Sequence, residues 1–306
     1  MKMNVPRRLW LTWLCGVALV SAASPGQAAT RALLVGIDRY TESGPRLGTN
    51  ATRAMWTDLD GAVNDVMAVR ELLITRLGFQ PDSIVVLTNG AATRAAILST
   101  YAQHLRDPAE PGDDVLFYYS GHGSQVVNSL STEPDRKDET IVPADSNRGA
   151  EDIRDKEMRR LHNEVLEKGA RLTVVMDSCH SGSAARGLAR EGKTRFLAPD
   201  LRDVADDSAA GPAPEERGAL IMSAAQDFQL AREDVEEAGG LEVKHGAFSL
   251  AFIRALRCAS PSTPAEELFL RARAQIKGRG WAQEPVLAGS SERRRAPLFG
   301  GAAATA

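Results

Sequence analysis

One short stretch, Leu172–Gly182 (LTVVMDSCHSG), constrains the fold of this chain more than any other. Its first half is apolar and β-branched, which is typical of a strand buried on both faces of a parallel sheet. A polar cluster then ends the strand abruptly and places Cys179 at its end. Ligands bind at the carboxyl ends of strands in open α/β sheets, so this position favours a chemical role for the thiol. The alternative is a small core cysteine, since free cysteine is often buried, but the neighbouring Asp, Ser, His and Gly argue against it.

A second strand-like run, Asp114–Ser120 (DVLFYYS), ends just as abruptly in Gly121-His122-Gly123-Ser124. Strands that follow each other in a chain are usually neighbours in the sheet. The intervening segment Asp155–Gly169 has the apolar spacing of a helix, which fits a crossover connection between two parallel strands. We therefore expect His122 and Cys179 to meet at one edge of a parallel sheet.

The rest of the chain alternates between the two periodicities, which predicts an α/β fold with a mostly parallel sheet. Leu59–Leu77 carries apolar residues every three or four positions and ends at a glycine, and Thr93 is placed to cap the next helix. Thr263-Pro264-Ala265-Glu266 reads as a capping box that starts a helix running to about Lys277. The other expected elements are strands at Arg31–Asp38, Ser83–Leu87, Ala219–Met222 and Pro285–Leu287 and a helix at Ala247–Leu256.

The motif pair YSGHGS and DSCHSG resembles that of the caspase-like cysteine peptidases (peptidase C14), most closely the metacaspase and orthocaspase branch. The resemblance covers essentially the whole chain after residue 29. It implies a caspase-like fold, with helices on both faces of a mostly parallel central sheet. It also implies a large segment at 30–185, a linker at 186–217 and a small segment at 218–306 of the same domain. The linker region is rich in Arg, Asp, Ala, Gly and Pro and shows neither period, so we expect no regular element in it.

The residue types at the two strand ends predict nucleophilic catalysis. Cysteine is nucleophilic as the thiolate, and a nearby imidazole can lower its pKa and later protonate a leaving amine. Cys179 would be the nucleophile and His122 the acid and base; His180, the immediate neighbour of the nucleophile, should point elsewhere. No third orienting side chain is evident. As the family implies, the N–H groups of Gly123 and Cys179 could form an oxyanion hole. A Cys/His metal site does not fit, because the chain has three cysteines and no CxxC spacing.

The resemblance also implies specificity for a basic residue. In metacaspases, positions that match Asp65, Ser120 and Asp177 line a pocket for Arg or Lys, and two carboxylates facing one guanidinium give charge-assisted hydrogen bonds. Ala62 stands where that family usually has a cysteine. The alternatives are a solvated acid near a helix start for Asp65 and a turn former at a strand end for Asp177.

Many metacaspases need calcium, which acts there as an activator, and no cofactor is required for the chemistry itself. Asp135, Asp138 and Glu139 supply the oxygen ligands that such an ion prefers. The seventh residue after Cys179, where the family places a further acid, is Arg186. A cation there leaves the site incomplete, so the same acidic loop can also be a solvated hairpin or a lip of the basic-residue pocket.

The first 29 residues have the order of charges, apolar residues and small residues of a secretory signal peptide. We expect cleavage near Ala28 or Ala29, a secreted or periplasmic protein and no stable membrane span afterwards; a retained N-terminal anchor is the alternative. Removing the three basic residues of this segment changes the formal net charge from −3 to −6, which disfavours nucleic acid as a partner. A disulfide between Cys179 and Cys258 would silence the nucleophile in an oxidising compartment.

Together these features predict a cysteine endopeptidase that cleaves protein or peptide substrates after Arg or Lys through a thioester acyl-enzyme. The alternatives are a catalytically silent caspase-like module that binds peptides or partners, and a peptide ligase that uses the same nucleophile. The oligomeric state is not indicated. The linker offers basic residues as sites of self-cleavage: Arg186, Arg190, Lys193, Arg195, Arg202 and Arg217.

Overall fold

The computed structural model describes residues 28–40, 53, 56–179, 193–209, 211–226, 229–238 and 240–300. The predicted signal peptide, apart from its last two residues, lies outside this part, as do His180, Arg186 and Arg190. No helix within the described ranges is both long enough and apolar enough to span a bilayer.

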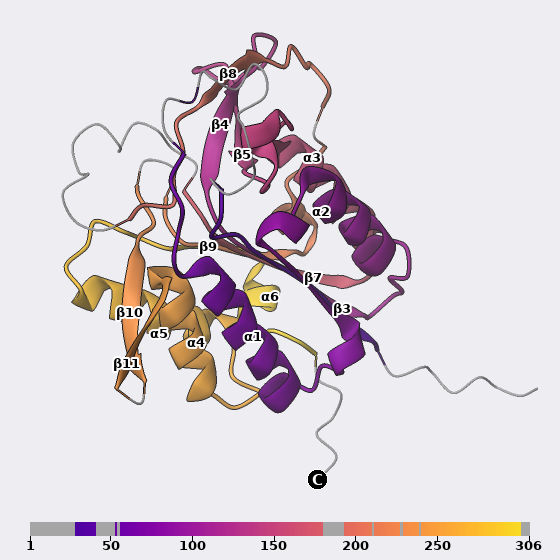
Figure 1. The fold of residues 1–306 in the computed structure, drawn as a ribbon. Coiled ribbons are helices and arrows are strands. Elements are labelled where there is room, and N and C mark those ends of the chain that lie inside the picture. Colours follow the sequence, from indigo (N-terminus) through magenta and orange to yellow (C-terminus); the bar gives the residue numbers. More distant parts are fainter. Residues whose placement is uncertain are drawn as a thin grey trace, which may run out of the picture.

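A six-stranded sheet with the order β12-β9-β7-β3-β1-β2 forms the centre of the molecule (Figure 1). Every neighbouring pair in it is parallel except the edge pair of β12 and β9. Its strands are β1 (Thr30–Gly36), β2 (Ile84–Thr88), β3 (Asp114–Ser120), β7 (Arg171–Asp177), β9 (Leu220–Ser223) and β12 (Val286–Ala288). The predicted mostly parallel α/β fold is therefore confirmed. The two strands that precede His122 and Cys179 are direct neighbours, and their last residues, Ser120 and Asp177, are partners in the register.

Helices cover both faces of this sheet (Figure 1). Alternate residues of the strands point to opposite faces, so Leu34 and Tyr118 pack on one side while Leu33 and Phe117 pack on the other. The first side is covered by α1 (Ala62–Leu77), α4 (Ala247–Arg257) and α5 (Ala265–Gly278), and the second by α2 (Arg94–Thr100) and α3 (Asp155–Glu167). The remaining helical segments are η2 (Pro81–Ser83), η3 (Asn89–Ala91), η4 (Tyr101–Arg106), η5 (Ser146–Arg148), η7 (Pro214–Arg217) and α6 (Ser291–Arg295).

The helix starts were predicted with mixed success. The Thr93 hydroxyl accepts a hydrogen bond from the N–H of Ala96, which confirms the expected cap of α2. The capping box predicted for α5 is wrong: its N-cap residue is Pro264 and no side chain caps it. The backbone satisfies this end instead, since the N–H of Ala265 donates to the carbonyl of Ala296.

The structure also contains two smaller sheets, which were not predicted from the sequence. One has the order β6-β5-β4-β8 and the other is the hairpin of β10 and β11. Their strands are β4 (Gly123–Val127), β5 (Lys137–Ile141), β6 (Ile153–Arg154), β8 (Asp200–Asp203), β10 (Glu233–Ala238) and β11 (Leu241–Gly246). The expectation that the linker lacks regular elements is wrong for its described part, which contains β8 and η7.

Candidate active site

His122 and Cys179 follow the ends of adjacent strands β3 and β7, and both side chains are buried. Cys179 is 1% exposed, and Cys258 lies on the surface. Both cysteines are free, so the disulfide considered from the sequence does not form here.

The imidazole of His122 is held by backbone and tyrosine groups. Its Nε2 lies 2.7 Å from the carbonyl oxygen of Thr57, which can only accept, so Nε2 carries the proton in the neutral ring. The backbone N–H of His122 donates to the Tyr40 hydroxyl at 2.9 Å, and the Tyr119 hydroxyl donates to the His122 carbonyl at 2.7 Å. Nδ1 is buried without a hydrogen-bond partner among the described residues. The orienting group is therefore a main-chain carbonyl, and Nδ1 is the nitrogen that can accept a proton.

Burial keeps both members of this pair uncharged in the present conformation. Removal from water lowers the pKa of His122 to about 4, against the opposing effect of the Thr57 carbonyl. Removal from water also raises the pKa of the Cys179 thiol to about 12, although the Ala231 N–H donates to the sulfur and lowers it. The thiolate–imidazole character expected from the sequence is therefore not present while the site is covered.

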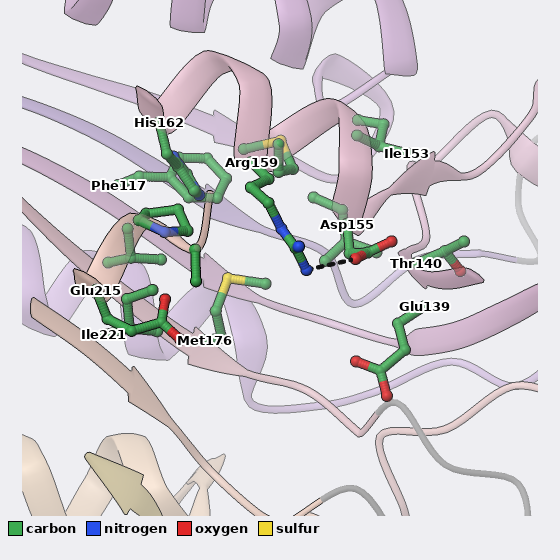
Figure 2. Close-up of a pocket in the computed structure, with 15 residues that line it drawn as sticks. Phe117, Glu139, Thr140, Ile153, Asp155, Arg159, His162, Met176, Glu215 and Ile221 are labelled. Atoms are coloured by element: carbon green, nitrogen blue, oxygen red, sulfur yellow. Dashed lines mark hydrogen bonds and ion pairs between the residues drawn. The ribbon is translucent and has the colours of Figure 1, made fainter. Parts of the chain in front are cut away.

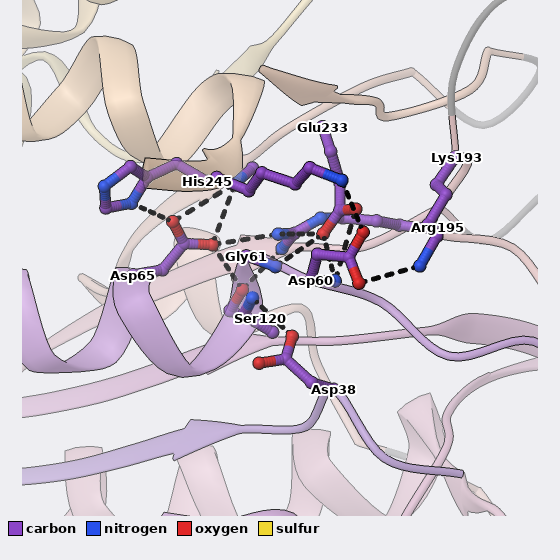
Figure 3. A network of polar contacts seen from close by, with 12 residues as sticks. Asp38, Asp60, Gly61, Asp65, Ser120, Lys193, Arg195, Glu233 and His245 are labelled. Carbon is purple, nitrogen blue, oxygen red and sulfur yellow. Dashed lines mark hydrogen bonds and ion pairs between the residues drawn. The ribbon is translucent and has the colours of Figure 1, made fainter. Parts of the chain in front are cut away.

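The three residues predicted to line a basic-residue pocket surround one guanidinium, that of Arg195. Figure 3 shows two of them, Asp65 and Ser120, beside Arg195. Asp65 accepts from Nη2 at 2.9 Å, and Nη1 donates to the Ser120 hydroxyl. The carboxylate of Asp177 lies 3.6 Å from Nη1, and its main-chain carbonyl accepts from the same nitrogen at 3.1 Å. All four side chains are fully buried. The structure thus brings Asp65, Ser120 and Asp177 together into one acidic pocket.

The hairpin β10–β11 completes this pocket with residues that the sequence did not single out. The Glu233 carboxylate lies 3.7 Å from Nη2 of Arg195 and accepts the N–H of Gly61 at 2.8 Å. His245 holds Asp65 through a 2.8 Å contact between Nδ1 and Oδ1. A methyl group at Gly246 would lie 2.6 Å from Cζ of Arg195, so the pocket wall needs a glycine there. Nothing in the local pattern around Glu233 marks it as a site residue, because its role depends on the hairpin folding back.

The electrostatic balance of the pocket favours a cation. Burial lowers the pKa of Arg195, but attraction to Asp177, Asp65 and Glu233 outweighs it and raises the pKa above its usual value. Burial raises the pKa of Asp177 and of Glu233, and the guanidinium lowers both. Three carboxylates face one positive charge, so an anionic side chain could not replace it.

The main chain of Arg195 is held as firmly as its side chain. Its carbonyl oxygen accepts the N–H of Gly123 at 2.9 Å and the N–H of Cys179 at 3.2 Å. These are the two donors that the sequence proposed for an oxyanion hole, and they converge on one carbonyl oxygen.

The predicted calcium ligands do not form a metal site. Asp138 is buried between two cations, with Nζ of Lys156 at 2.7 Å and Nη1 of Arg154 at 3.3 Å, and Asn128 donates to both of its oxygens. Oδ1 of Asp135 accepts from the N–H of Lys137 at 3.3 Å. Throughout the described ranges, no group of three or more His, Cys, Asp or Glu residues could hold a metal ion. A lysine and an arginine occupy the place of the cation beside Asp138.

A cavity of about 250 Å³ lies between α3, β5 and β7 (Figure 2). It is lined on one side by Arg159, which pairs with Asp155, and on the other by apolar residues such as Met176 and Ile221. Neither His122 nor Cys179 lines it. The site at the sheet edge is therefore defined by its polar contacts and is filled by the chain itself.

The protein thus has an α/β fold with a histidine and a cysteine at the ends of adjacent parallel strands. An acidic pocket lies beside them. A family model described as metacaspase, peptidase C14 domain matches residues 30–186, just over half of the chain. The chain belongs to this family, so the resemblance noted from the sequence is confirmed.

Matches to individual metacaspases agree with this family assignment. The chain is 36% identical over 163 residues to metacaspase-1 of Schizosaccharomyces pombe, covering 52% of this chain and 35% of the relative. It is 33% identical over 190 residues to metacaspase-9 of Arabidopsis thaliana, covering 60% and 54%. It is 27% identical over 306 residues to metacaspase-1 of Eremothecium gossypii, covering 84% and 63%. The matches therefore cover between about a third and two thirds of these relatives.

A crystal structure of a protein from Geobacter sulfurreducens supports the fold. It is similar with a TM-score of 0.60 and 22% identity, over 88% of this chain and 97% of that protein. At this identity the likeness concerns the fold alone.

Proposed function

We propose that this protein is a cysteine endopeptidase that hydrolyses peptide bonds after arginine, and less efficiently after lysine. One observation carries the proposal: a guanidinium fills the acidic pocket while the carbonyl of the same residue accepts the N–H groups of Gly123 and Cys179. The arrangement offers a place for the side chain before the scissile bond and two donors for the developing oxyanion.

The contacts favour arginine over lysine. Nη1 donates to Ser120 and to the Asp177 carbonyl, while Nη2 donates to Asp65. The two nitrogens of a planar fork reach these groups at once, whereas a single ammonium nitrogen would reach one set.

The proposed chemistry uses the two strand-end side chains. Cys179 gives its proton to Nδ1 of His122 as its sulfur attacks the carbonyl carbon, and His122 then gives that proton to the leaving amine. Water hydrolyses the thioester with His122 as the base, and the thiol is restored. The Thr57 carbonyl fixes the ring on its far side, which leaves Nδ1 free for both transfers.

Hydrolysis of matched fluorogenic peptides with Arg, Lys or Asp before the reporter tests this proposal. We expect the hydrolysis rate to be highest for the Arg peptide, lower for the Lys peptide and not measurable for the Asp peptide. Cys179→Ala should hydrolyse none of them. Equal rates for Arg and Asp would refute the acidic-pocket assignment. No hydrolysis and no labelling of Cys179 by an arginyl electrophile would indicate a silent peptide-binding module. Transfer to an added amine in place of hydrolysis would indicate a ligase.

We also propose that the protein is exported. The proposal depends on the order of residues in the first 29 positions, and β1 begins at Thr30, directly after the expected cleavage site. Amino-terminal sequencing of the protein from its native cells should give a start near Ala28 or Ala29. An intact N-terminus on the mature protein would contradict it.

A further inference from the structure

The cavity between α3, β5 and β7 lies on the opposite face of the central sheet from the acidic pocket. Successive residues of a strand point to opposite faces. Asp177 accepts from the Ser249 hydroxyl of α4 on one face, whereas its neighbour Met176 lines the cavity on the face covered by α3. None of Asp65, Ser120 and Asp177 lines the cavity. The cavity and the acidic pocket therefore adjoin the same end of β7 without sharing a side chain.

Most of the side chains around the cavity are apolar. Its volume of about 250 Å³ lies just below the range of about 300–1,000 Å³ that is typical of ligand pockets. The cavity therefore suits a small organic molecule. The apolar part of its lining includes Phe117, Ile141, Met158, Met176 and Ile221. Burial of an aromatic ring or a branched aliphatic chain against these residues is favourable.

The charged side chains around the cavity give it a negative balance. Among the described lining residues, carboxylates outnumber guanidinium groups by three to one. The carboxylates are those of Glu139, Asp155 and Glu215, and the guanidinium is that of Arg159. Burial lowers the pKa of His162, which also lines the cavity, to about 3, so this ring adds no charge at neutral pH. The lining thus favours a cation.

Two of these carboxylates can accept a further hydrogen bond. Figure 2 shows Glu215 on one side of the cavity, with Asp155 and Arg159 on the other. Oδ2 of Asp155 lies 3.3 Å from Nη2 of Arg159, but Oδ1 is buried without a hydrogen-bond partner among the described residues. In the same part of the chain, no hydrogen bond or ion pair is found for the Glu215 side chain. A buried acceptor without a donor is costly, so an N–H donor in the cavity would stabilise Asp155.

We infer that this cavity is a separate ligand site for a small amphipathic amine. The apolar body of the amine packs against Met176 and Ile221, and its ammonium group lies near Asp155 and Glu215. The inference does not depend on the proposed peptidase function, because neither the cysteine–histidine pair nor the acidic pocket contributes to the lining. The amine should bind while Arg195 fills the acidic pocket.

The test uses 2-phenylethylamine as the probe and the full chain with Cys179→Ala, so that no peptide bond is cut during the measurement. Binding is followed by isothermal titration calorimetry and by NMR of the methionine methyl groups. We expect saturable shifts of the Met158 and Met176 signals, and none for Met67, which is exposed on α1. The uncharged analogue 2-phenylethanol should bind about tenfold more weakly or worse, and 3-phenylpropanoate should not bind measurably.

Matched variants locate the ammonium group. Glu215→Gln should weaken binding of the amine about tenfold, whereas Glu216→Gln alters an exposed neighbour outside the lining and should not change it. Arg159→Gln removes the cation of the cavity and leaves Asp155 unpaired, so it should tighten binding about two- to fivefold. Arg160→Gln, again outside the lining, should leave binding unchanged. These side chains are partly or fully exposed, and a melting curve of each variant checks its fold.

Asp65→Asn separates this cavity from the acidic pocket, since it should leave binding of the amine unchanged. Weaker binding in folded Asp65→Asn would place the amine in the acidic pocket and overturn the inference. Equal binding of the amine and the alcohol, tighter binding of 3-phenylpropanoate, or unshifted Met158 and Met176 signals would also overturn it. Hydrolysis of arginyl peptides is not measured here, so failure of this inference leaves the proposed function standing.

Discussion

The contribution of Asp65 to recognition of a basic residue can be measured with one substitution. Asp65 is buried and accepts a 2.9 Å hydrogen bond from the guanidinium. Asp65→Asn keeps the shape and removes the charge. A hydrogen bond to a charged group contributes about 1.5–3 kcal/mol, and about 1.4 kcal/mol corresponds to a factor of ten. We therefore expect kcat/KM for an arginyl peptide to fall about 10- to 150-fold.

A citrulline peptide separates this loss from general damage, because citrulline has nearly the shape of arginine but no charge. Asp65→Asn should change kcat/KM for the citrulline peptide far less than for the arginyl peptide. Asp60→Asn is the matched control: Asp60 pairs with Lys193 and Lys244 on a partly exposed surface, where ion pairs contribute little. Equal losses on both peptides would show that Asp65 acts through the fold, and the reasoning about the pocket charge would be wrong.

Three further predictions concern other groups. While Arg195 fills the pocket, burial raises the pKa of Cys179 to about 12, so alkylation by iodoacetamide should be slow at pH 7 and should rise about tenfold per pH unit up to pH 10; a plateau near pH 8 would contradict this. Because Lys156 and Arg154 already neutralise Asp138, a calcium chelator should change neither the melting temperature nor arginyl-peptide hydrolysis, and loss of either would restore a calcium site. Gly246→Ala places a methyl group 2.1 Å from Oδ2 of Asp177, so it should abolish arginyl-peptide hydrolysis but leave iodoacetamide labelling of Cys179; unchanged hydrolysis would refute the assignment of Gly246 to the pocket wall.

The inner strands β1, β3 and β7 of the central sheet could be predicted from the sequence because they are largely buried on both faces. Runs such as Asp114–Ser120 are long, apolar and sharply ended, and the structure places that strand at the same residues. The second sheet could not be predicted, since β6 has two residues and β5 (KDETI) is largely polar. These short strands are specified by their partners across the sheet, which local pattern does not encode.

The same distinction between local pattern and distant partners applies to the residues of the site. The placement of His122 and Cys179 at one sheet edge could be predicted because polar motifs follow two buried strands, and the parallel register of β3 and β7 brings those strand ends together. The role of Thr57 was not predictable, because it acts through a carbonyl that every residue has. Glu233 and His245 reach the pocket only after the β10–β11 hairpin packs against α1, so no local spacing indicates them.

The charges of the pocket determine which side chain it can hold. Asp65, Asp177 and Glu233 are buried around one guanidinium, and removing one partner of such a cluster leaves an uncompensated charge that costs about 3–5 kcal/mol. A pocket this acidic is therefore unfavourable when it is closed and empty, and in the described conformation Arg195 fills it. The same penalty excludes acidic and neutral side chains from the closed site. Under the proposed function, a substrate that displaces Arg195 must therefore bring a cation of its own.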